Sequence, residues 1–188
     1  MRCENNFIEN TSRDKTGRYT VALPFGDNKE LLGDSLKNAL SLFQRLELRF
    51  DRDENLRNGY SNFMSEYETL GHMKRVGNLN EIIDHRVEKP EYYIPHHPVF
   101  KTSSSTTKLR VVFNASSPRT TDLSLNNILL VGPTIQSGLF SILIRFRNHN
   151  VALIGDIEKI FRQVNVIKQH RDLQRILWRN NKNDPITI

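Results

Sequence analysis

The sequence contains little cysteine and no long apolar run, and each shortage excludes a class of protein. Cys3 is the only cysteine among 188 residues, which excludes an internal disulfide and a zinc site built from cysteines. The longest apolar stretches, such as residues 128–131, fall far short of the roughly 20 residues that cross a bilayer. The first 25 residues carry several charges and lack the apolar core of a secretory signal. We therefore expect a protein without membrane contact in a reducing intracellular compartment.

Negative charge is scarce in the second half of the chain. The whole sequence has 27 Lys and Arg against 21 Asp and Glu, a formal net charge of +6. Residues 1–90 hold 14 basic and 15 acidic side chains, whereas residues 91–188 hold 13 and 6. A basic half indicates a polyanionic partner, for which nucleic acid is the simplest candidate because each neutralised phosphate releases counterions. A solvated basic face without a partner is the alternative.

The first half predicts two helices that follow a short arm. Residues 1–33 form the arm, with a strand expected at 19–23. Apolar residues recur at spacings of three and four over residues 34–50 and again over 53–70, which is the period of an amphipathic helix. Gly71 is a natural C-terminal cap for the second helix. We expect a helical hairpin whose aromatic stripes form the core.

The second half changes in composition after a polar linker at residues 76–91. Two prolines indicate an extended segment at 92–100, and the β-branched residues of 109–113 indicate a strand. Together they predict a β-hairpin whose Ser/Thr-rich tip, residues 101–108, is basic. A further helix is expected from residue 134 to about 148.

A continuous apolar run at residues 151–155 predicts a buried strand that ends on a carboxylate, Asp156. A turn or short helix is expected over 157–166, and another strand over 172–178. A carboxylate at a rigid strand end suits Mg²⁺, which prefers hard oxygen ligands, and polymerases use two such ions. The alternative is a surface acid or a helix cap.

Six strings in the sequence resemble, in order, the reverse transcriptase region of BEL/Pao-type long-terminal-repeat retrotransposons. They are residues 18–25, 66–73, 92–101, 106–116, 123–133 and the motif that starts at Asp156. The resemblance implies an α+β fold, namely a partial right-hand polymerase with fingers and the beginning of the palm, preceded by a helical hairpin. The parts expected are an N-terminal arm at 1–33, a helical leader at 34–75, a linker at 76–91 and partial fingers and palm at 92–188.

The same resemblance implies roles for residues of the palm motif. Asp156 matches the first catalytic aspartate, which binds Mg²⁺. Phe161 matches the aromatic steric gate that collides with a ribose 2′-hydroxyl, with a core aromatic as the alternative. Gln163 matches a frequent glutamine that shapes the nucleotide pocket, with a surface glutamine as the alternative. Glu158 does not match a metal ligand and is expected to be solvated or salt-bridged.

The resemblance also implies a triphosphate site on the predicted hairpin. Arg110 matches the fingers arginine that contacts the incoming deoxynucleotide, and its bidentate fork suits phosphate oxygens. Either Lys101 or Lys108 matches the lysine at the γ-phosphate, and a solvated basic turn is the alternative. Asn114 stands where family members usually carry Asp, so a salt bridge from this position is in doubt.

Two further observations limit what we expect of this chain. His96 and His97 are adjacent in an extended segment and point to opposite faces, which argues against a shared zinc ion and leaves packing or RNA-facing roles. The sequence contains no Asp-Asp dipeptide, so the Tyr-x-Asp-Asp motif that completes a two-metal site is absent.

We therefore expect a fragment of an RNA-directed DNA polymerase that is inactive alone. In the intact parent it binds an RNA or DNA template-primer and dNTP, as part of a retrotransposon polyprotein in a cytoplasmic virus-like particle. One alternative is a non-catalytic nucleic-acid-binding remnant or domesticated fragment that acts through residues 101–119 and 145–179. Another is a small helical interaction module at residues 34–71.

Overall fold

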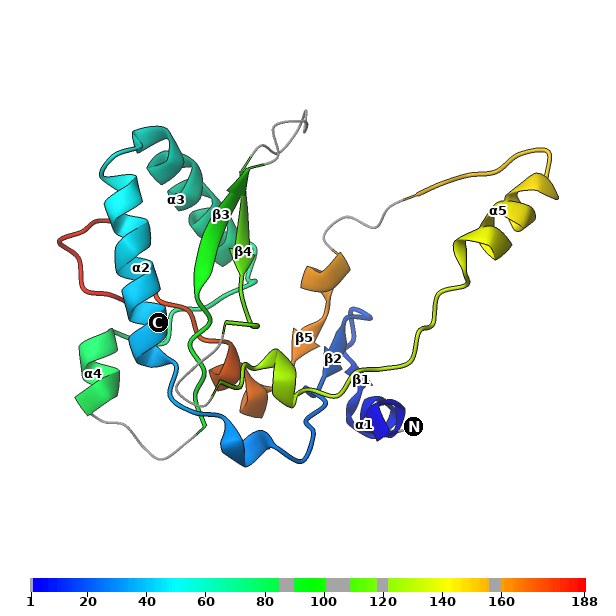
Figure 1. Ribbon diagram of the computed structural model, residues 1–188, viewed down its shortest axis with the longest axis horizontal. Helices are drawn as coiled ribbons and strands as arrows, with labels where there is room; N and C mark the ends of the chain where they lie inside the picture. Colours follow the sequence, from blue (N-terminus) through cyan, green and yellow to red (C-terminus); the bar gives the residue numbers. More distant parts are fainter. Residues whose placement is uncertain (1, 85–89, 101–108, 118–121, 156–159) are drawn as a thin grey trace. The chain divides into compact units, whose positions relative to one another are not determined.

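The computed structural model combines helices with small sheets, which confirms the α+β class in general terms (Figure 1). It describes residues 2–84, 90–100, 109–117, 122–155 and 160–188. The chain forms two compact units by its internal contacts. One unit comprises residues 1–24 and 130–166, and the other comprises residues 25–129 and 167–188. The four-part division expected from the sequence stays a prediction.

The larger unit is built around a hairpin of two helices, α2 (Leu36–Phe50) and α3 (Glu54–Thr69), as the apolar spacing predicted. The turn between them spans residues 51–53. Asp53 caps the start of α3 by accepting a hydrogen bond from the Leu56 backbone N–H at 2.9 Å. Helix α3 ends at Thr69, and Gly71 follows its C-cap with a φ of +70°, which only glycine adopts easily. The amides of Gly71 and His72 then reach back to carbonyls of the last turn, at 2.9 and 3.0 Å, which completes the predicted cap.

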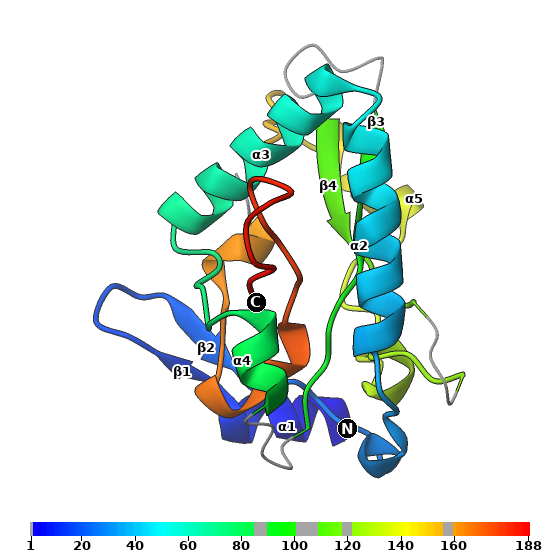
Figure 2. The ribbon, with the colours of Figure 1, turned by 90° about the vertical axis from the view of Figure 1, so that its left-hand side faces the viewer.

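Beside this hairpin, β3 (His96–Phe100) and β4 (Leu109–Phe113) form the two-stranded antiparallel sheet that the sequence predicted. Figure 2 shows the two strands next to α2 and α3. Side chains alternate between the two faces along each strand. One face of the sheet therefore turns inward, and its residues Leu109, Val111 and Phe113 pack against the core. Gly59 of α3 permits this approach, because a Cβ at that position would lie 3.0 Å from a methyl carbon of Leu109.

Residues 167–188 return to the larger unit and pair with segments far away in the sequence. The 3₁₀ helix η4 (Lys168–Gln174) occupies the first three residues of the region where a strand was predicted over 172–178. That prediction is wrong for residues 172–174, and extended pairing begins only at Arg175, which bridges to Tyr93. Trp178 forms a β-bridge with Thr187. The backbone of Ile188 then pairs with that of Val76 and Gly77, just before the short helix α4 (Leu79–Asp84).

The core of the larger unit is an aromatic cluster. Trp178 lies at its centre, with ring centroids 5.5 to 6.3 Å from those of Phe43, Phe50, Tyr60 and His96. These residues come from α2, α3, β3 and the C-terminal segment, so the two helices share one core with the rest of the unit. The unit also contains the short 3₁₀ helices η1 (Lys29–Leu31) and η2 (Asn126–Ile128).

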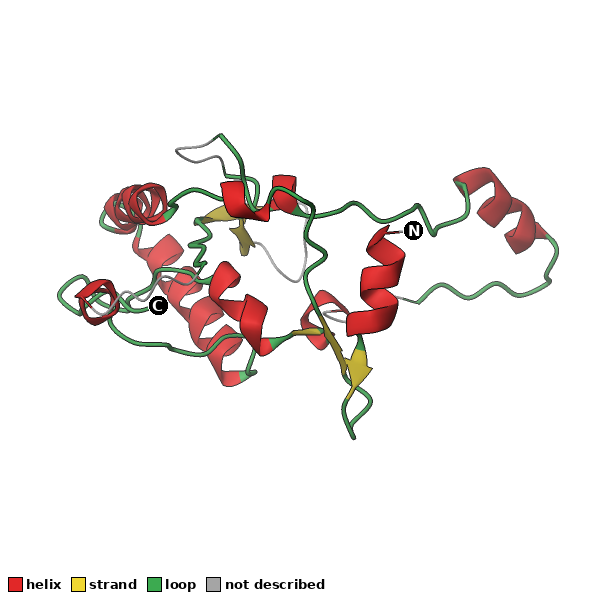
Figure 3. Cartoon of the chain, turned by 90° about the horizontal axis from the view of Figure 1, so that it is seen from below, coloured by secondary structure: helices red, strands yellow, loops and turns green. Residues whose placement is uncertain are grey.

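The smaller unit is held together by short strands. Strand β2 (Tyr19–Val21), predicted at 19–23, pairs antiparallel with β1 (Ser12–Arg13) and parallel with β5 (Asn165–Val166). The unit also contains helices α1 (Arg2–Asn10) and α5 (Leu139–Arg147) and the 3₁₀ turn η3 (Ile160–Gln163). Figure 3 shows loop on both sides of α5.

The predicted buried strand at residues 151–155 is not formed, and this expectation is wrong. The segment has no regular structure, and Val151, Leu153 and Ile154 are exposed by 75%, 88% and 88%. A strand needs a neighbouring strand for its backbone hydrogen bonds, and no described segment pairs with this one. Helix α5 is shorter than predicted and also exposes its apolar side chains, with Phe140 at 76%. None of the described helices combines the length and apolar character needed to cross a membrane.

Candidate functional site

The outer face of the β3–β4 sheet carries the nucleotide-binding arginine predicted from the sequence. Cross-strand pairing sets Arg110 opposite Val99 and Val112 opposite His97, and all four side chains are exposed. Because the inner face packs on the core, the hairpin cannot slip by one residue without turning its apolar side chains into water. The register therefore fixes the Arg110 guanidinium on the solvent side.

Arg110 is open to an anionic ligand on this face. Arg175, Arg179 and Lys182 each pair with a carboxylate, whereas no described carboxylate is paired with Arg110. A guanidinium keeps its charge at any physiological pH and can bind phosphate through two parallel hydrogen bonds. The two candidate lysines, Lys101 and Lys108, lie outside the described residues.

Asn114 directly follows β4, and its side chain forms a hydrogen bond within the next turn. Its backbone N–H donates to the Pro95 carbonyl at 2.8 Å, and its side-chain oxygen accepts from the Ser116 N–H at 3.1 Å. This is an Asx turn, which an asparagine forms as well as an aspartate does. Asn114 therefore forms this turn without the charge that an aspartate would add.

The side chain of Tyr92 connects the loop after β4 with the segment before η2. Its side chain is buried, and its hydroxyl donates toward the carbonyls of Ala115 and Ser117 at 3.3 and 3.4 Å. The same oxygen accepts a hydrogen bond from the Leu125 N–H at 3.1 Å. The sequence predicts no role for Tyr92, because its bonding partners lie more than twenty residues away and no local signal marks it.

Polar side chains continue this connection beneath the hairpin. The side-chain amide of Asn126 donates to the Ser116 hydroxyl at 2.7 Å, and the backbone N–H of Asn126 donates to the Ala115 carbonyl at 3.2 Å. Asn38 of α2 donates to the Ser117 hydroxyl at 3.1 Å. Two of the strings on which the resemblance depends, 106–116 and 123–133, are thus bonded to each other. The bond from Asn38 in turn holds Ser117, near the base of the hairpin, to α2.

His96 is a buried structural histidine. Its Nε2 lies 2.8 Å from the Leu177 carbonyl, and its Nδ1 lies 2.5 Å from the Tyr60 hydroxyl. Because a carbonyl only accepts, Nε2 carries the proton and Nδ1 accepts from Tyr60. Burial lowers the pKa of His96 to about 4, a shift that the hydrogen bond to Leu177 opposes. The neutral ring therefore connects α3, β3 and the C-terminal segment.

His97 lies on the opposite face of β3 and is exposed, as expected for adjacent residues of a strand. The described residues contain no group of three or more His, Cys, Asp or Glu side chains that could bind a metal ion. Asp156, the predicted Mg²⁺ ligand, and Glu158 lie outside the described residues. The Mg²⁺ site stays a prediction.

Phe161 and Gln163, the two residues predicted to shape the nucleotide pocket, belong to η3 in the smaller unit. Phe161 is 92% exposed, so the alternative that it is a core aromatic is wrong, and Gln163 is exposed as well. Arg18 holds this turn by donating from Nε to the Gln163 carbonyl at 3.1 Å and from its terminal nitrogen to the Arg162 carbonyl at 2.7 Å. This role of Arg18 has no local signal in the sequence, because its partners lie 145 and 144 residues away.

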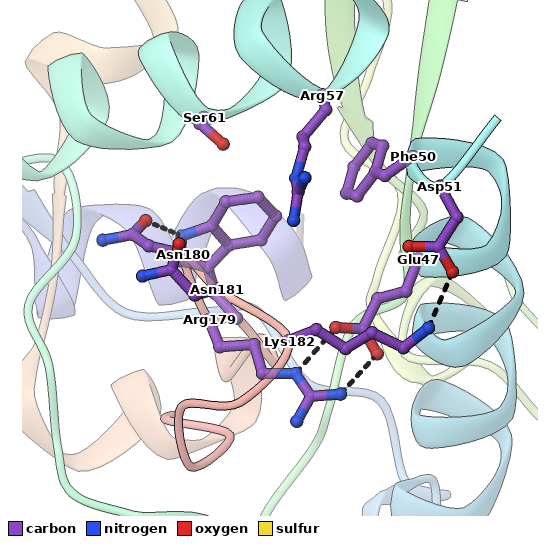
Figure 4. Close-up of a pocket in the computed structure, with 10 residues that line it drawn as sticks. Glu47, Phe50, Asp51, Arg57, Ser61, Arg179, Asn180, Asn181 and Lys182 are labelled. Carbon is purple, nitrogen blue, oxygen red and sulfur yellow. Dashed lines mark hydrogen bonds and ion pairs between the residues drawn. The ribbon is translucent and has the colours of Figure 1, made fainter. Parts of the chain in front are cut away.

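A charged pocket between α2 and the C-terminal segment has a structural role (Figure 4). Arg179 makes a bidentate ion pair with Glu47 at 2.7 and 2.8 Å, and Lys182 contacts Asp51 at 2.7 Å. The cavity that these side chains enclose with Trp178 measures only about 20 Å³, room for little more than one water molecule. We conclude that these ion pairs fasten the segment and that the pocket is not a ligand site.

The structure therefore brings some of the predicted site residues together and leaves others undescribed. Phe161 and Gln163 share one turn of the smaller unit, Arg110 lies on the hairpin of the larger unit, and Asp156, Lys101 and Lys108 lie outside the described residues. Comparisons with protein-family models, with curated proteins and with solved structures find no match to this chain.

Proposed function

We propose that this chain is the fingers and first part of the palm of an RNA-directed DNA polymerase of the BEL/Pao retrotransposon type. The observation that supports the proposal most is the β3–β4 hairpin, with Arg110 on its exposed face and its base bonded to the following loops. Such a hairpin can lie over an incoming nucleotide while its inner face stays anchored in the core. The parent protein would use it to extend a primer on an RNA or DNA template.

In this proposal, Arg110 and one of the two lysines, Lys101 or Lys108, bind the triphosphate of the deoxynucleotide. The guanidinium contributes a fixed charge and two parallel donors, which orient the phosphates as well as attract them. Phe161 limits the space at the sugar, and Gln163 contributes to the same pocket. Asp156 would hold Mg²⁺, which as a Lewis acid stabilises charge on the transferring phosphoryl group.

Replacing Asp156 by asparagine tests the proposal directly. In a protein that continues from residue 188 through the downstream reading frame, we expect primer extension to fall to the level of a reaction without enzyme. An amide is neutral and binds Mg²⁺ more weakly than a carboxylate does. Incorporation of labelled dNTP on a primed homopolymer template is the measurement.

The control for this experiment is Asp172→Asn, which changes a half-exposed carboxylate of η4 that pairs with Arg175. We expect this variant to keep most of the activity. Equal activity of wild type and Asp156→Asn would refute the assigned role. Salt-dependent nucleic-acid binding without any extension by the wild-type protein would favour the non-catalytic alternative.

Replacing Phe161 by alanine is expected to raise incorporation of ribonucleotides, relative to deoxynucleotides, by at least about tenfold, a typical effect for one contact in a pocket. The ring is 92% exposed, so its removal leaves the fold intact. Phe140→Ala, which removes another exposed phenyl of the same unit, is the matched control. An unchanged ratio of the two incorporation rates in Phe161→Ala would exclude the gate.

A further inference from the structure

A second candidate site lies between α2 and the start of β3, within the larger unit. It is a cavity of about 270 Å³, more than ten times the volume enclosed by the ion pairs of Figure 4. Residues of α2 form one wall, and the segment from Pro95 to His97, with Asn114, forms the other. None of the residues assigned to the catalytic or triphosphate site lines it.

The rim of the cavity is positively charged. Arg45 and Arg49 are four residues apart and therefore lie on the same face of α2, and both side chains are exposed. No acidic residue is among the described residues that line the cavity. The only acidic residue of α2 is Glu47, which is bound by Arg179 at 2.7 Å. The two guanidinium groups therefore keep their full charge for a ligand.

The floor of the cavity is apolar. Leu42 and Leu46 of α2 and Pro95 line it, and buried His96 already has a hydrogen-bond partner at each ring nitrogen. Apolar lining residues next to two guanidinium groups suit a ligand with an apolar ring and flanking phosphates. Single-stranded nucleic acid has both, because unpaired bases are free to stack and each is flanked by phosphates.

We propose that this cavity binds one unpaired base of a single-stranded nucleic acid, with Arg45 and Arg49 on the adjoining phosphates. The choice of ligand class rests on the proposed function, whereas the cavity and its charges do not. Duplex is a poor ligand for this site because its bases are paired and stacked. The site would hold a single strand next to the hairpin that carries Arg110.

The double variant Arg45→Gln, Arg49→Gln tests the proposal on the whole chain. Fluorescence anisotropy with a labelled twelve-residue oligo-dT or oligo-U probe measures the dissociation constant at several salt concentrations. Loss of two phosphate contacts is expected to lower the slope of log K against log salt by roughly 1.4. The affinity at low salt should fall by about tenfold or more. Thermal unfolding should be unchanged, since both side chains are exposed.

The matched control removes the same charge elsewhere. Lys37→Gln with Arg52→Gln changes one exposed residue in the first turn of α2 and one just after its end, and neither lines the cavity. This variant is expected to bind the probe as the wild type does. An equal loss of affinity in the two double variants would overturn the proposal, because net charge alone would then explain binding.

Two further probes define the ligand. An abasic backbone of the same length should bind the wild type at least about fivefold more weakly, because the apolar contact between the base and the cavity floor is lost. Equal binding of the abasic probe, or equal competition by polyglutamate, would overturn the proposal in favour of a site for any polyanion.

The binding assay and primer extension together separate this inference from the proposed function. If Arg45→Gln, Arg49→Gln binds the probe as the wild type does while Asp156→Asn still abolishes primer extension, the cavity site is wrong and the proposed function stands. If the wild type binds no single strand at all, both are wrong.

Discussion

Replacing His96 by alanine is expected to lower the free energy of unfolding of the larger unit by about 4 kcal/mol. Deleting a buried ring leaves a cavity, and large-to-small core changes cost about 2 to 5 kcal/mol. The change also leaves the Tyr60 hydroxyl and the Leu177 carbonyl without their partner in the core, at about 1 to 3 kcal/mol for such a group. A loss of this size is a large fraction of the total stability of a typical domain, about 5 to 15 kcal/mol.

Urea titration followed by the fluorescence of Trp178, the only tryptophan, measures this loss. The His96 and Trp178 ring centroids are 6.2 Å apart, so the probe reports on the same core. His97→Ala is the matched control, because this neighbouring histidine is exposed on the other face of β3 and its removal should change little. Equal destabilisation by the two variants would show that His96 is not the link between these elements.

The lowered pKa of His96 predicts that the stability of the larger unit depends on pH. Burial lowers the pKa of His96 to about 4 in the folded protein, whereas a histidine in an unfolded chain titrates near 6.5. Because the unfolded state then binds the proton more readily, this contribution to stability is complete above pH 6.5 and is lost as the pH falls toward 4. The expected slope is about 1.4 kcal/mol per pH unit across that range.

A variant that keeps a polar contact separates the titration from simple loss of packing. His96→Gln can donate an amide hydrogen to the Leu177 carbonyl, but it does not titrate. We expect its unfolding midpoint in urea to change less than that of the wild type between pH 7 and pH 5. Parallel pH profiles of the two proteins would mean that His96 is already charged in the folded state.

Replacing Trp178 by alanine is expected to destabilise the larger unit by about 4 kcal/mol, within the range of about 3 to 5 kcal/mol for large aromatic core residues. The indole stacks on Tyr60 at 5.5 Å and lies near the rings of Phe43 and Phe50. Its backbone is hydrogen-bonded with Thr187 in both directions, at 2.8 and 3.0 Å. Loss of the ring should therefore release the C-terminal segment from the two helices.

Far-UV circular dichroism in urea is the measurement for this variant, since it lacks the fluorescent probe. Limited proteolysis should cut Trp178→Ala within residues 179–186 much sooner than the wild type. Lys182→Gln is the control, because its ion pair with Asp51 is largely exposed and screened by solvent. Unchanged proteolysis of Trp178→Ala would contradict the role of this side chain as the anchor of the segment.

The elements that were predicted correctly are those whose signals are local. Helices α2 and α3 follow from apolar spacing, and the end of α3 follows from Gly71. The β3–β4 hairpin follows from two prolines and a β-branched run. Each signal acts within a few residues, so it does not depend on how the chain packs elsewhere. The outward position of Arg110 then follows from the period of the strand.

The errors concern segments that need distant partners. The apolar run at residues 151–155 has strand composition, but no described segment supplies the neighbouring strand, and it stays exposed. Residues 172–174 form a 3₁₀ helix, because the pairing of this region with Tyr93 begins only at Arg175. Composition indicates what a segment can form, and its partner decides whether it does.

The sequence by itself determined the charge of the second half, the two helices and the hairpin, whereas the polymerase role stays a proposal. Only the tertiary structure decided that His96 is buried while His97 is exposed, that Trp178 is the centre of the core, and that Arg45 and Arg49 border a cavity. The physical reason is separation along the chain. Tyr60, His96 and Leu177 are 36 and 81 residues apart, and their contacts exist only after the hydrophobic core has brought their elements together.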